Sequence, residues 1–331
     1  FSFFIDSKSF KIDHILLEGE YIIIATGTKA SSFEGIPIDR NKIITHREAI
    51  DLKSIPENIL ILGGNVEGVE FAAAYGEMKK NVTIIEKEDV LLFGNDADLV
   101  SPIEIHLIEK GVKILKGIGV EKAWVENNKV KVKLENEEII EGDKALVTFL
   151  RKPSFPKGIE RLNINIDEDR IVVDKNLKTG EDHIFAIGDI NGILGMGHVA
   201  INQGIQVANY ILNKTPVNID YEILPRAIFT LPEMAGIGKQ EWELVNRPYK
   251  VRYCNFKDTW RGWAKDIEKG FVKVIIDEGG VILGIWMVGE NVSEYIGLFS
   301  LLMKDKLTIE DIKTNLIIHP TITESLLEAT L

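Results

Sequence analysis

The feature that most constrains the fold is a glycine-rich turn between a short apolar strand and a helix. The pattern predicts a strand at Ile59–Leu62, the turn at Gly63–Gly68, a helix at Val69–Met78 and a second strand at Val82–Glu86. Strand, turn, helix and strand in this order form a βαβ unit, which joins two parallel strands. Other Ile/Val-rich runs alternate with helical stretches along the chain, so we predict an α/β fold.

The composition limits the class of protein. The 331 residues are enough for about two domains. The formal charge of −12 repels phosphate backbones, so we expect no nucleic-acid partner. No apolar run approaches the ~20 residues of a membrane helix, and we expect no membrane contact and a cytoplasmic location. Cys254 is the only cysteine and the six histidines are scattered, which excludes a disulfide scaffold and predicts no metal site.

The segments before and after the βαβ unit predict other kinds of secondary structure and a linker. Residues 1–30 predict a β-meander that ends in a buried strand, Tyr21–Ala25, and Lys214-Thr215-Pro216 marks a linker. Val130–Leu134 and Glu138–Ile140 predict a hairpin. The last third predicts an α+β arrangement, with strands at Val251–Phe256, Phe271–Asp277 and Ile282–Val288 and helices at Ser293–Lys304 and Thr308–Lys313.

The glycine turn has the position of a dinucleotide-binding fingerprint. Gly63, Gly64 and Gly68 allow the backbone to approach a pyrophosphate, whose charge the helix N-terminus stabilises. Glu86 ends the second strand and is placed to hydrogen-bond the adenosine ribose. An acidic residue there favours NAD over NADP, because it would repel a 2′-phosphate. The alternative is a βαβ unit whose glycines serve only packing.

Two residues depart from that fingerprint. Asn65 stands where the second glycine is expected, at the point kept bare for phosphate approach. Glu67 adds a negative charge to the first helical turn, which suits the helix dipole but competes with a bound anion. These departures leave the fingerprint interpretation and the packing interpretation both open.

Two further groups of polar residues are candidate functional sites. Gly188-Asp189 ends a strand before a glycine-rich loop, where a carboxylate can hydrogen-bond a ribityl or ribose hydroxyl; the alternative is a helix cap. His319 and Glu324 can form a general acid/base pair in which the carboxylate sets the tautomer of the imidazole. The alternative is a capping box, Thr321-x-x-Glu324, at the start of the final helix.

Together these segments resemble the pyridine nucleotide–disulfide oxidoreductases, and within that family the dihydrolipoamide dehydrogenases. The quoted matches run in the family's order and are Ile24-Ala25-Thr26-Gly27-Thr28, Thr179-Gly180 with Ile184–Asp189, Met196-Gly197-His198, Thr230–Ala235, Lys269–Lys273, Ile282-Leu283-Gly284, and His319-Pro320-Thr321 with Glu324. The resemblance implies Rossmann-like FAD- and NAD(P)-binding domains followed by an α+β dimerisation domain. The implied divisions are 1–49 (first FAD-binding segment, C-terminal part), 50–152 (NAD-binding), 153–219 (second FAD-binding and central segment) and 220–331 (interface).

The resemblance also implies roles for individual residues. His319 and Glu324 would be the catalytic pair. FAD would contact Thr26, Gly27, Gly188, Asp189, Met196, Gly197 and His198, whereas NAD would contact Gly63, Gly64, Gly68, Glu86 and Val120. Electrons would pass from a dithiol, dihydrolipoamide, through FAD to NAD. The histidine acts on the disulfide of the other subunit, so a homodimer is expected, with a lipoyl-bearing acyltransferase of a 2-oxoacid dehydrogenase complex as a candidate partner.

Besides Asn65 and Glu67, two features separate this sequence from the family pattern. The segment with the first GxGxxG and the C-x-x-x-x-C redox disulfide lies outside the sequence, which begins at Phe1 rather than Met, and Cys254 cannot replace that pair. Leu150 occupies a position where the family has glycine. A truncated, non-catalytic paralogue that acts as a binding or dimerisation partner is therefore the alternative. A relative without a redox disulfide, such as an NADH oxidase or ferredoxin reductase, is disfavoured because it needs no His–Glu pair.

Overall fold

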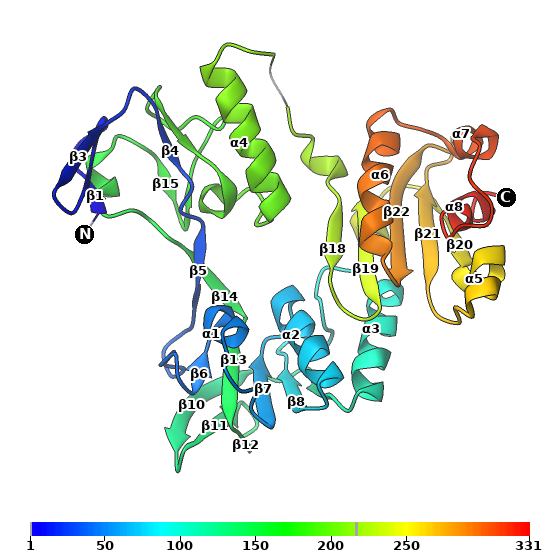
Figure 1. Cartoon of the computed structure of the whole chain (residues 1–331), viewed down its shortest axis with the longest axis horizontal. Helices are drawn as coiled ribbons and strands as arrows, with labels where there is room; N and C mark the ends of the chain where they lie inside the picture. The colour runs from blue at the N-terminus through cyan, green and yellow to red at the C-terminus, as the bar shows by residue number, and fades with distance from the viewer. Residues whose placement is uncertain (1, 216–217) are drawn as a thin grey trace. The chain divides into compact units, whose positions relative to one another are not determined.

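The structure is a computed structural model that describes residues 2–215 and 218–331. Pro216, the end of the predicted linker, lies outside the described residues, as does Phe1 of the predicted meander. The chain forms two compact units (Figure 1). Unit 1 combines Phe1–Ser31 with Leu150–Ile219, and unit 2 combines Ser32–Phe149 with Asp220–Leu331. The division into four functional segments stays a prediction.

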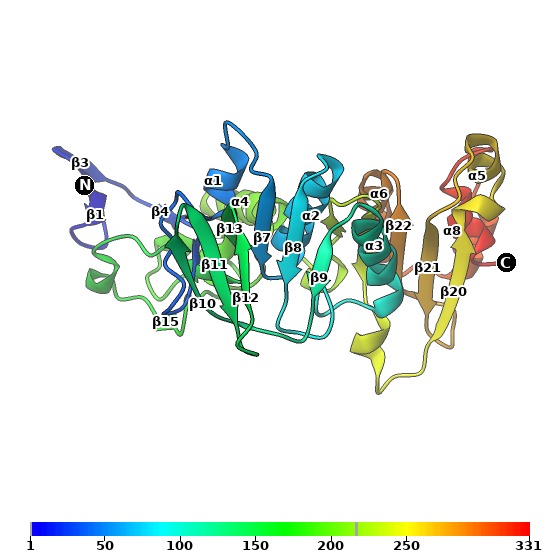
Figure 2. The same cartoon turned by 90° about the horizontal axis from the view of Figure 1, so that it is seen from below.

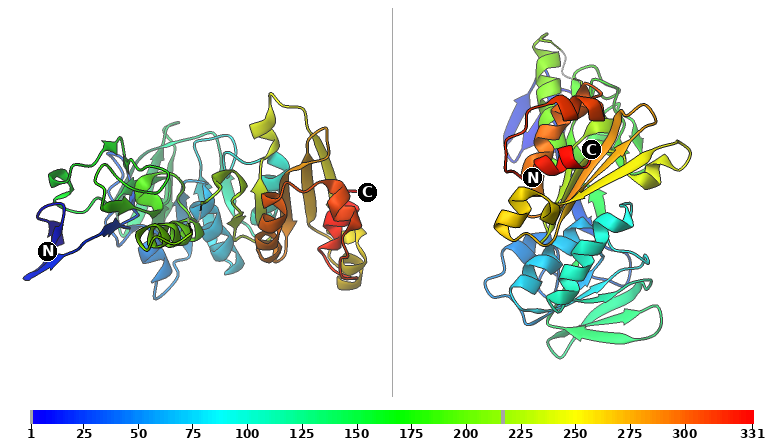
Figure 3. Two further views of the ribbon diagram at one scale, coloured as in Figure 1. Left: turned by 90° about the horizontal axis from the view of Figure 1, so that it is seen from above. Right: turned by 90° about the vertical axis from the view of Figure 1, so that its right-hand side faces the viewer.

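Unit 1 contains the predicted N-terminal meander and three two-stranded sheets, one of which is the antiparallel pair β15 and β16. The meander is antiparallel, in the order β1-β2-β3, while β4 pairs in parallel with β17 and β5 pairs antiparallel with β14. A single long helix, α4, follows the loop after β17 (Figure 3). The elements of unit 1 are β1 (Ser2–Phe4), β2 (Ser9–Ile12), β3 (Ile15–Glu18), β4 (Ile22–Ile24), β5 (Thr28–Ser31), β14 (Leu150–Pro153), η1 (Ile159–Arg161), β15 (Ile166–Asp167), β16 (Arg170–Ile171), β17 (Ile184–Ala186), η2 (Gly188–Asn191) and α4 (Gly197–Ile211).

The prediction of a buried strand at Tyr21–Ala25 is partly wrong. The strand is shorter, Ile22–Ile24, and although Ile24 is buried, Ile23 is 44% exposed. Within the described residues β4 pairs only with β17, so its other edge has no neighbouring strand. A run of isoleucines is typical of a strand covered on both faces, whereas here the covering is incomplete.

Unit 2 contains the predicted βαβ unit in a parallel sheet of order β6-β13-β7-β8-β9 (Figure 2). The chain passes from β7 through β8 to β9 on one side of β7, whereas β13 and β6 lie on the other side. The carboxyl end of β7 is therefore a topological switch point, the usual place for a ligand in such sheets. The elements are β6 (Ile43–Ile44), α1 (His46–Ile50), β7 (Asn58–Leu62), α2 (Val66–Glu77), β8 (Asn81–Ile85), α3 (Ala97–Glu109), β9 (Lys113–Leu115) and β13 (Lys144–Val147).

The predicted hairpin is also present. It consists of β11 (Lys129–Leu134) and β12 (Ile139–Gly142), and β10 (Val120–Glu126) adds a strand that the sequence pattern did not predict. The helix after the glycine turn begins at Val66 rather than Val69, because the side chain of Asn65 caps it.

The last third of the chain forms the predicted α+β arrangement. Its antiparallel sheet has the order β18-β19-β22-β21-β20. One face packs against α6, α7 and α8, and the other presents Ile228, Met234 and Trp286 to the core around α2 and α3. The elements are η3 (Tyr221–Ile223), β18 (Arg226–Ile228), β19 (Glu233–Gly238), η4 (Glu241–Leu244), β20 (Lys250–Asn255), η5 (Phe256–Asp258), α5 (Trp260–Lys265), β21 (Phe271–Ile276), β22 (Ile282–Gly289), α6 (Val292–Lys304), α7 (Ile309–Thr314) and α8 (Glu324–Glu328).

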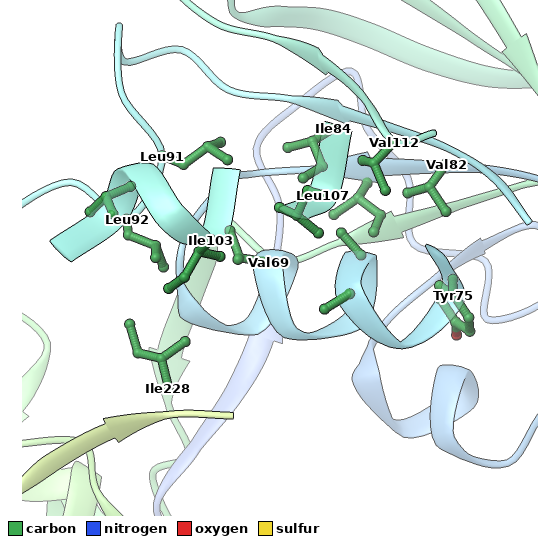
Figure 4. Close-up of a cluster of buried hydrophobic side chains, with 14 of the residues drawn as sticks. Val69, Tyr75, Val82, Ile84, Leu91, Leu92, Ile103, Leu107, Val112 and Ile228 are labelled. Atoms are coloured by element: carbon green, nitrogen blue, oxygen red, sulfur yellow. The ribbon is translucent and has the colours of Figure 1, made fainter. Parts of the chain in front are cut away.

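A continuous hydrophobic core joins the parallel sheet of unit 2 to its antiparallel sheet. Figure 4 shows Ile228 directed towards the side chains of α2 and α3, near Val69 and Ile103. Because both sheets share this core, they belong to the same compact unit. Among the described residues, no helix combines the length and apolar character needed to span a bilayer.

Candidate functional site

The glycine turn at the end of β7 has the backbone geometry of a nucleotide-binding loop. Gly63 has a φ of +116°, which side chains rarely tolerate. A Cβ at Gly68 would lie 1.9 Å from the Gly63 carbonyl oxygen, so glycine is required for α2 to approach β7. Gly64 donates its N–H to Glu86 Oε2 over 2.5 Å. The structure therefore brings Gly63, Gly64, Gly68 and Glu86 together, as predicted for a fingerprint.

Asn65 changes what this turn offers to a ligand. Its Oδ1 accepts the N–H of Gly68 over 3.0 Å, and its Nδ2 donates to the Thr148 carbonyl over 2.8 Å. Thr148 follows β13, the strand that pairs with β7. The Asn65 side chain therefore connects the turn after β7 to the segment after β13. A pyrophosphate bound at the N-terminus of α2 would compete with this side chain for the N–H of Gly68.

Glu67 lies in the first turn of α2, and its carboxylate faces α1. Its Oε1 is 3.3 Å from His46 Nδ1, and both side chains are mostly buried. The Glu86 carboxylate and the bare glycines fit the ribose of a dinucleotide. Asn65 and Glu67, by contrast, disfavour binding of its pyrophosphate.

Two residues assigned to NAD binding or exclusion belong to other elements than the turn. Val120 begins β10 opposite Leu134, half-buried beside the core of the parallel sheet. Leu150 begins β14 in unit 1, opposite Ser31. Their roles toward a nucleotide stay predictions.

In unit 1, the parallel pairing of β4 with β17 brings the two predicted flavin motifs to the same end. Asp189 Oδ2 accepts the hydroxyl of Thr28 over 2.8 Å, and the Thr28 oxygen accepts Arg151 Nε over 2.9 Å. Asp189 lies inside η2, so its carboxylate does not cap a helix. Thr28 and Arg151 were missed as site residues, although Thr28 belongs to the quoted motif.

The loop beyond Asp189 leaves its carboxylate accessible. A Cβ at Gly195 would contact this carboxylate at 3.6 Å, and a Cβ at Gly27 or Gly197 would meet no atom within 4 Å. Met196 is half-buried, and Gly197 and His198 are exposed at the start of α4. Thr26 is exposed beside Gly27. An oriented carboxylate beside open glycines fits a hydroxyl-rich cofactor segment, such as the ribityl chain of FAD.

His319 and Glu324 form a hydrogen-bonded pair in the loop before α8. His319 Nδ1 lies 2.8 Å from Glu324 Oε1, and Glu324 Oε2 accepts the N–H of Thr321 over 2.7 Å. Burial raises the pKa of Glu324, but the Thr321 N–H and His319 outweigh it and hold the pKa below its ordinary value. An ionised carboxylate accepts hydrogen bonds only, so it fixes the proton on Nδ1 and leaves the lone pair on Nε2. His319 is 58% exposed and can exchange a proton with a ligand.

The capping alternative for Glu324 is partly wrong. The N-cap of α8 is Thr323, and Thr321 Oγ donates to the Ile318 carbonyl instead of capping the helix. Glu324 therefore satisfies one backbone N–H while it also holds His319.

Cys254 lies in β20 with its thiol buried. Burial raises the pKa of this thiol to about 11. A thiol that stays protonated is a poor nucleophile, so Cys254 cannot act in place of a redox dithiol.

A second polar cluster, not predicted from the sequence, surrounds Lys273. Its side chain is 0% exposed, and its Nζ lies 2.9 Å from Asp96, 2.9 Å from Asp98 and 2.6 Å from Glu241. Burial lowers the pKa of Lys273, but these carboxylates outweigh it and raise the pKa above its ordinary value. The three carboxylates have the spacing of metal ligands, but here the ammonium lies among them. Because Lys273 and Glu241 are distant in sequence from Asp96 and Asp98, no local pattern indicates this cluster.

Three features together define a class of protein, the oxidoreductases that bind two nucleotide cofactors. They are the parallel sheet with its glycine turn, the flavin-type motifs of unit 1, and the α+β domain with a His–Glu pair. The chain belongs to the pyridine nucleotide-disulphide oxidoreductase family: residues 3–204 match that family, and residues 224–330 match its dimerisation domain. The predicted family and fold class are thereby confirmed.

Relatives in other organisms support the same assignment. The chain is 30% identical to dihydrolipoyl dehydrogenase of Chlamydia pneumoniae over 94% of its own length and 68% of the relative's. It is also 30% identical to the dihydrolipoamide dehydrogenase of Chaetomium thermophilum. This match covers 94% of this chain and 64% of that relative. Among solved structures, LpdA of Mycobacterium tuberculosis superposes with a TM-score of 0.89 at 26% identity, covering 96% of this chain and 70% of LpdA. The flavoprotein disulfide reductase RclA of Escherichia coli, as its Cu(II) complex, gives 0.91 at 26% identity, covering 99% and 77%.

Proposed function

We propose that this chain forms part of a dihydrolipoyl dehydrogenase-like flavoprotein that oxidises a dithiol and transfers the electrons to NAD. The observation that carries the proposal is the His319–Glu324 pair. A capping role requires Glu324 but not the imidazole, whereas the pair provides a proton acceptor with a fixed tautomer.

The reaction converts dihydrolipoamide and NAD⁺ to lipoamide, NADH and a proton. A bound FAD would relay the electron pair between the dithiol and the nicotinamide. His319 Nε2 would accept the thiol proton, because the thiolate is the reactive form. Glu324 would stabilise the resulting imidazolium, and Asp189 would hold a cofactor hydroxyl while Thr28 and Arg151 fix its orientation.

The proposed reaction requires a redox disulfide in addition to the dithiol of the substrate. This disulfide must come from outside the sequence, because Cys254 is its only cysteine. We propose a homodimer through the interface domain, so that His319 acts on the partner subunit's disulfide. A lipoyl-bearing acyltransferase is the proposed partner, and the cytoplasm is the proposed location.

The first experiment is a visible absorption spectrum of the purified protein, followed by lipoamide turnover. We expect the bands of bound flavin and a turnover that falls at least a hundredfold in His319→Ala, the usual scale of lost acid–base catalysis. His14→Ala, an exposed histidine, is the control. Equal turnover in both variants would remove His319 from the mechanism.

A second candidate function is a non-catalytic subunit that pairs with an intact relative. The bridge from Asn65 to Thr148 favours it, because this contact occupies the crevice where a nucleotide would bind. A colourless protein that releases no flavin on denaturation would support this second function.

A further inference from the structure

Two tryptophans lie beside His319 on a neighbouring element. Trp260 and Trp263 belong to α5, which lies next to α8 in the interface domain (Figure 1). The Trp260 ring meets the His319 imidazole edge-on, with centroids 6.2 Å apart, and meets Trp263 edge-on at 6.4 Å. Trp260 is 67% exposed and Trp263 is 77% exposed. Large exposed aromatic pairs are characteristic of binding sites rather than of bare surface.

The helix that carries both indoles is held rigidly. Thr259 is buried, and its hydroxyl donates to the Phe256 carbonyl over 2.7 Å while it accepts the N–H of Gly262 over 3.0 Å. A Cβ at Gly262 would lie 1.8 Å from the Phe256 carbonyl oxygen. These contacts hold α5 against Phe256 and so position the helix that carries both indoles.

The surface next to the indoles is hollowed, and the residues that line the hollow carry no net charge. A hollow of about 440 Å³ is lined by Lys257, Asp258, Thr259, Trp260 and Trp263. This size is typical of small-molecule sites. Lys257 and Asp258 offset each other, so the hollow offers apolar area without attracting a multiply charged ligand.

We propose that Trp260 and Trp263 form an aromatic wall that binds the carrier chain of the dithiol or disulfide on which His319 acts. The wall selects an uncharged, apolar carrier over a charged peptide carrier. This inference rests on the proposed function and adds the residues that determine its substrate class. Trp263 contacts Trp260, and Trp260 contacts the His319 imidazole, so an alkyl chain that lies against the two indoles would bring its sulfur atoms close to the imidazole.

The test is a titration of the ¹⁵N-tryptophan-labelled chain with lipoamide or with glutathione disulfide, followed through the indole N–H signals. We expect lipoamide to shift the signals of Trp260 and Trp263 but not that of Trp242, an exposed indole on η4. Glutathione disulfide should bind at least about tenfold more weakly. Trp260→Ala should weaken lipoamide binding about tenfold, whereas Trp260→Phe should keep most of the affinity because it retains an aromatic face.

Three results would overturn the inference. They are equal affinity for the two probes, unchanged lipoamide affinity in Trp260→Ala, and indole signals that respond to protein concentration but not to lipoamide. The last result would mean that a second copy of the chain covers the tryptophans. Binding needs neither flavin nor turnover, so selective binding by an inactive protein would contradict only the proposed function. Normal turnover with unchanged affinity in Trp260→Ala would contradict only the inference.

Discussion

At the scale of single residues, Asn65 decides whether the glycine turn is open to a nucleotide. Its side chain satisfies the N–H of Gly68 and reaches across to Thr148, and glycine in its place would leave both groups accessible. Glu67 adds a carboxylate to the same helix turn. The backbone of the fingerprint is therefore retained while its anion site is occupied.

If Asn65 and Glu67 close the anion site, as in the second candidate function, calorimetry should detect no NADH binding at micromolar concentrations by the unmodified chain. The double variant Asn65→Gly with Glu67→Gln should bind NADH at least tenfold more tightly, about 1.4 kcal/mol, because it frees the helix N-terminus and removes a charge. Glycine at an N-cap costs only a few tenths of a kcal/mol, so the fold should persist. Asn127→Gly in the turn after β10 is the control. Micromolar binding by the unmodified chain would contradict this prediction.

Asp143 provides a pH-dependent contribution to the stability of unit 2. The Lys129 ammonium, at 2.6 Å, and the Asn58 N–H, at 2.8 Å, lower the pKa of Asp143 to about 2 from 3.8. A lowered pKa means that the ionised form stabilises the fold above about pH 4. This stabilisation is lost as the pH falls from about 4 towards about 2.

We therefore expect Asp143→Asn to lower the free energy of unfolding by about 1–2 kcal/mol at neutral pH. The difference from the unmodified chain should shrink towards zero near pH 2, as measured by urea unfolding across a pH series. Glu141→Gln, an exposed neighbour, should have little effect at any pH. A difference that does not depend on pH would show that the carboxylate charge is not the cause.

At the scale of elements, the Lys273 cluster attaches α3 to the antiparallel sheet. Asp96 and Asp98 lie at the N-terminus of α3, Lys273 lies in β21, and Glu241 lies in η4. Tyr253 Oη also donates to Asp98 Oδ2 over 2.9 Å. The cluster therefore joins α3, which packs beside the parallel sheet of unit 2, to the dimerisation domain through a buried charge.

Lys273→Met should destabilise unit 2 by about 3–5 kcal/mol, because it leaves three neighbouring carboxylates without their cation. Lys269→Met is the matched control: Lys269 pairs with Glu109 at 2.8 Å, but both side chains are exposed, so the expected loss is below about 1 kcal/mol. Urea unfolding of both variants is the measurement. Similar losses would show that the buried cluster has no special energetic role.

At the scale of the whole molecule, the dimerisation domain predicts a stable dimer. Leu298 and Leu301 form an exposed apolar stripe on α6, and exposed stripes of this kind commonly mark interfaces. Sedimentation velocity should give twice the 37.2 kDa mass of the chain. Leu301→Glu should weaken the dimer at least tenfold by placing a charge in an apolar contact. Ile108→Glu on α3 is the control for an exposed apolar residue elsewhere. A monomeric chain would exclude the mechanism in which His319 acts across subunits.

The sequence by itself determined several local units and their order along the chain. The βαβ unit, the hairpin and the α+β arrangement of the last third follow from local periodicity and from glycines that the backbone requires at Gly63 and Gly68. These signals depend on residues close together in the chain, so they are visible without a structure. The short spacing from His319 to Glu324 likewise made that pair predictable.

Only the tertiary structure decided which distant side chains meet. Asn65 reaches Thr148, Asp189 meets Thr28, Trp260 meets His319, and Lys273 lies among three carboxylates. Each contact joins segments separated by tens of residues or more, and it forms because strand register and helix packing bring their ends together. Local patterns carry no information about such pairs. The physical reason is that side-chain chemistry is set by neighbours in space, whereas periodicity records only neighbours in sequence.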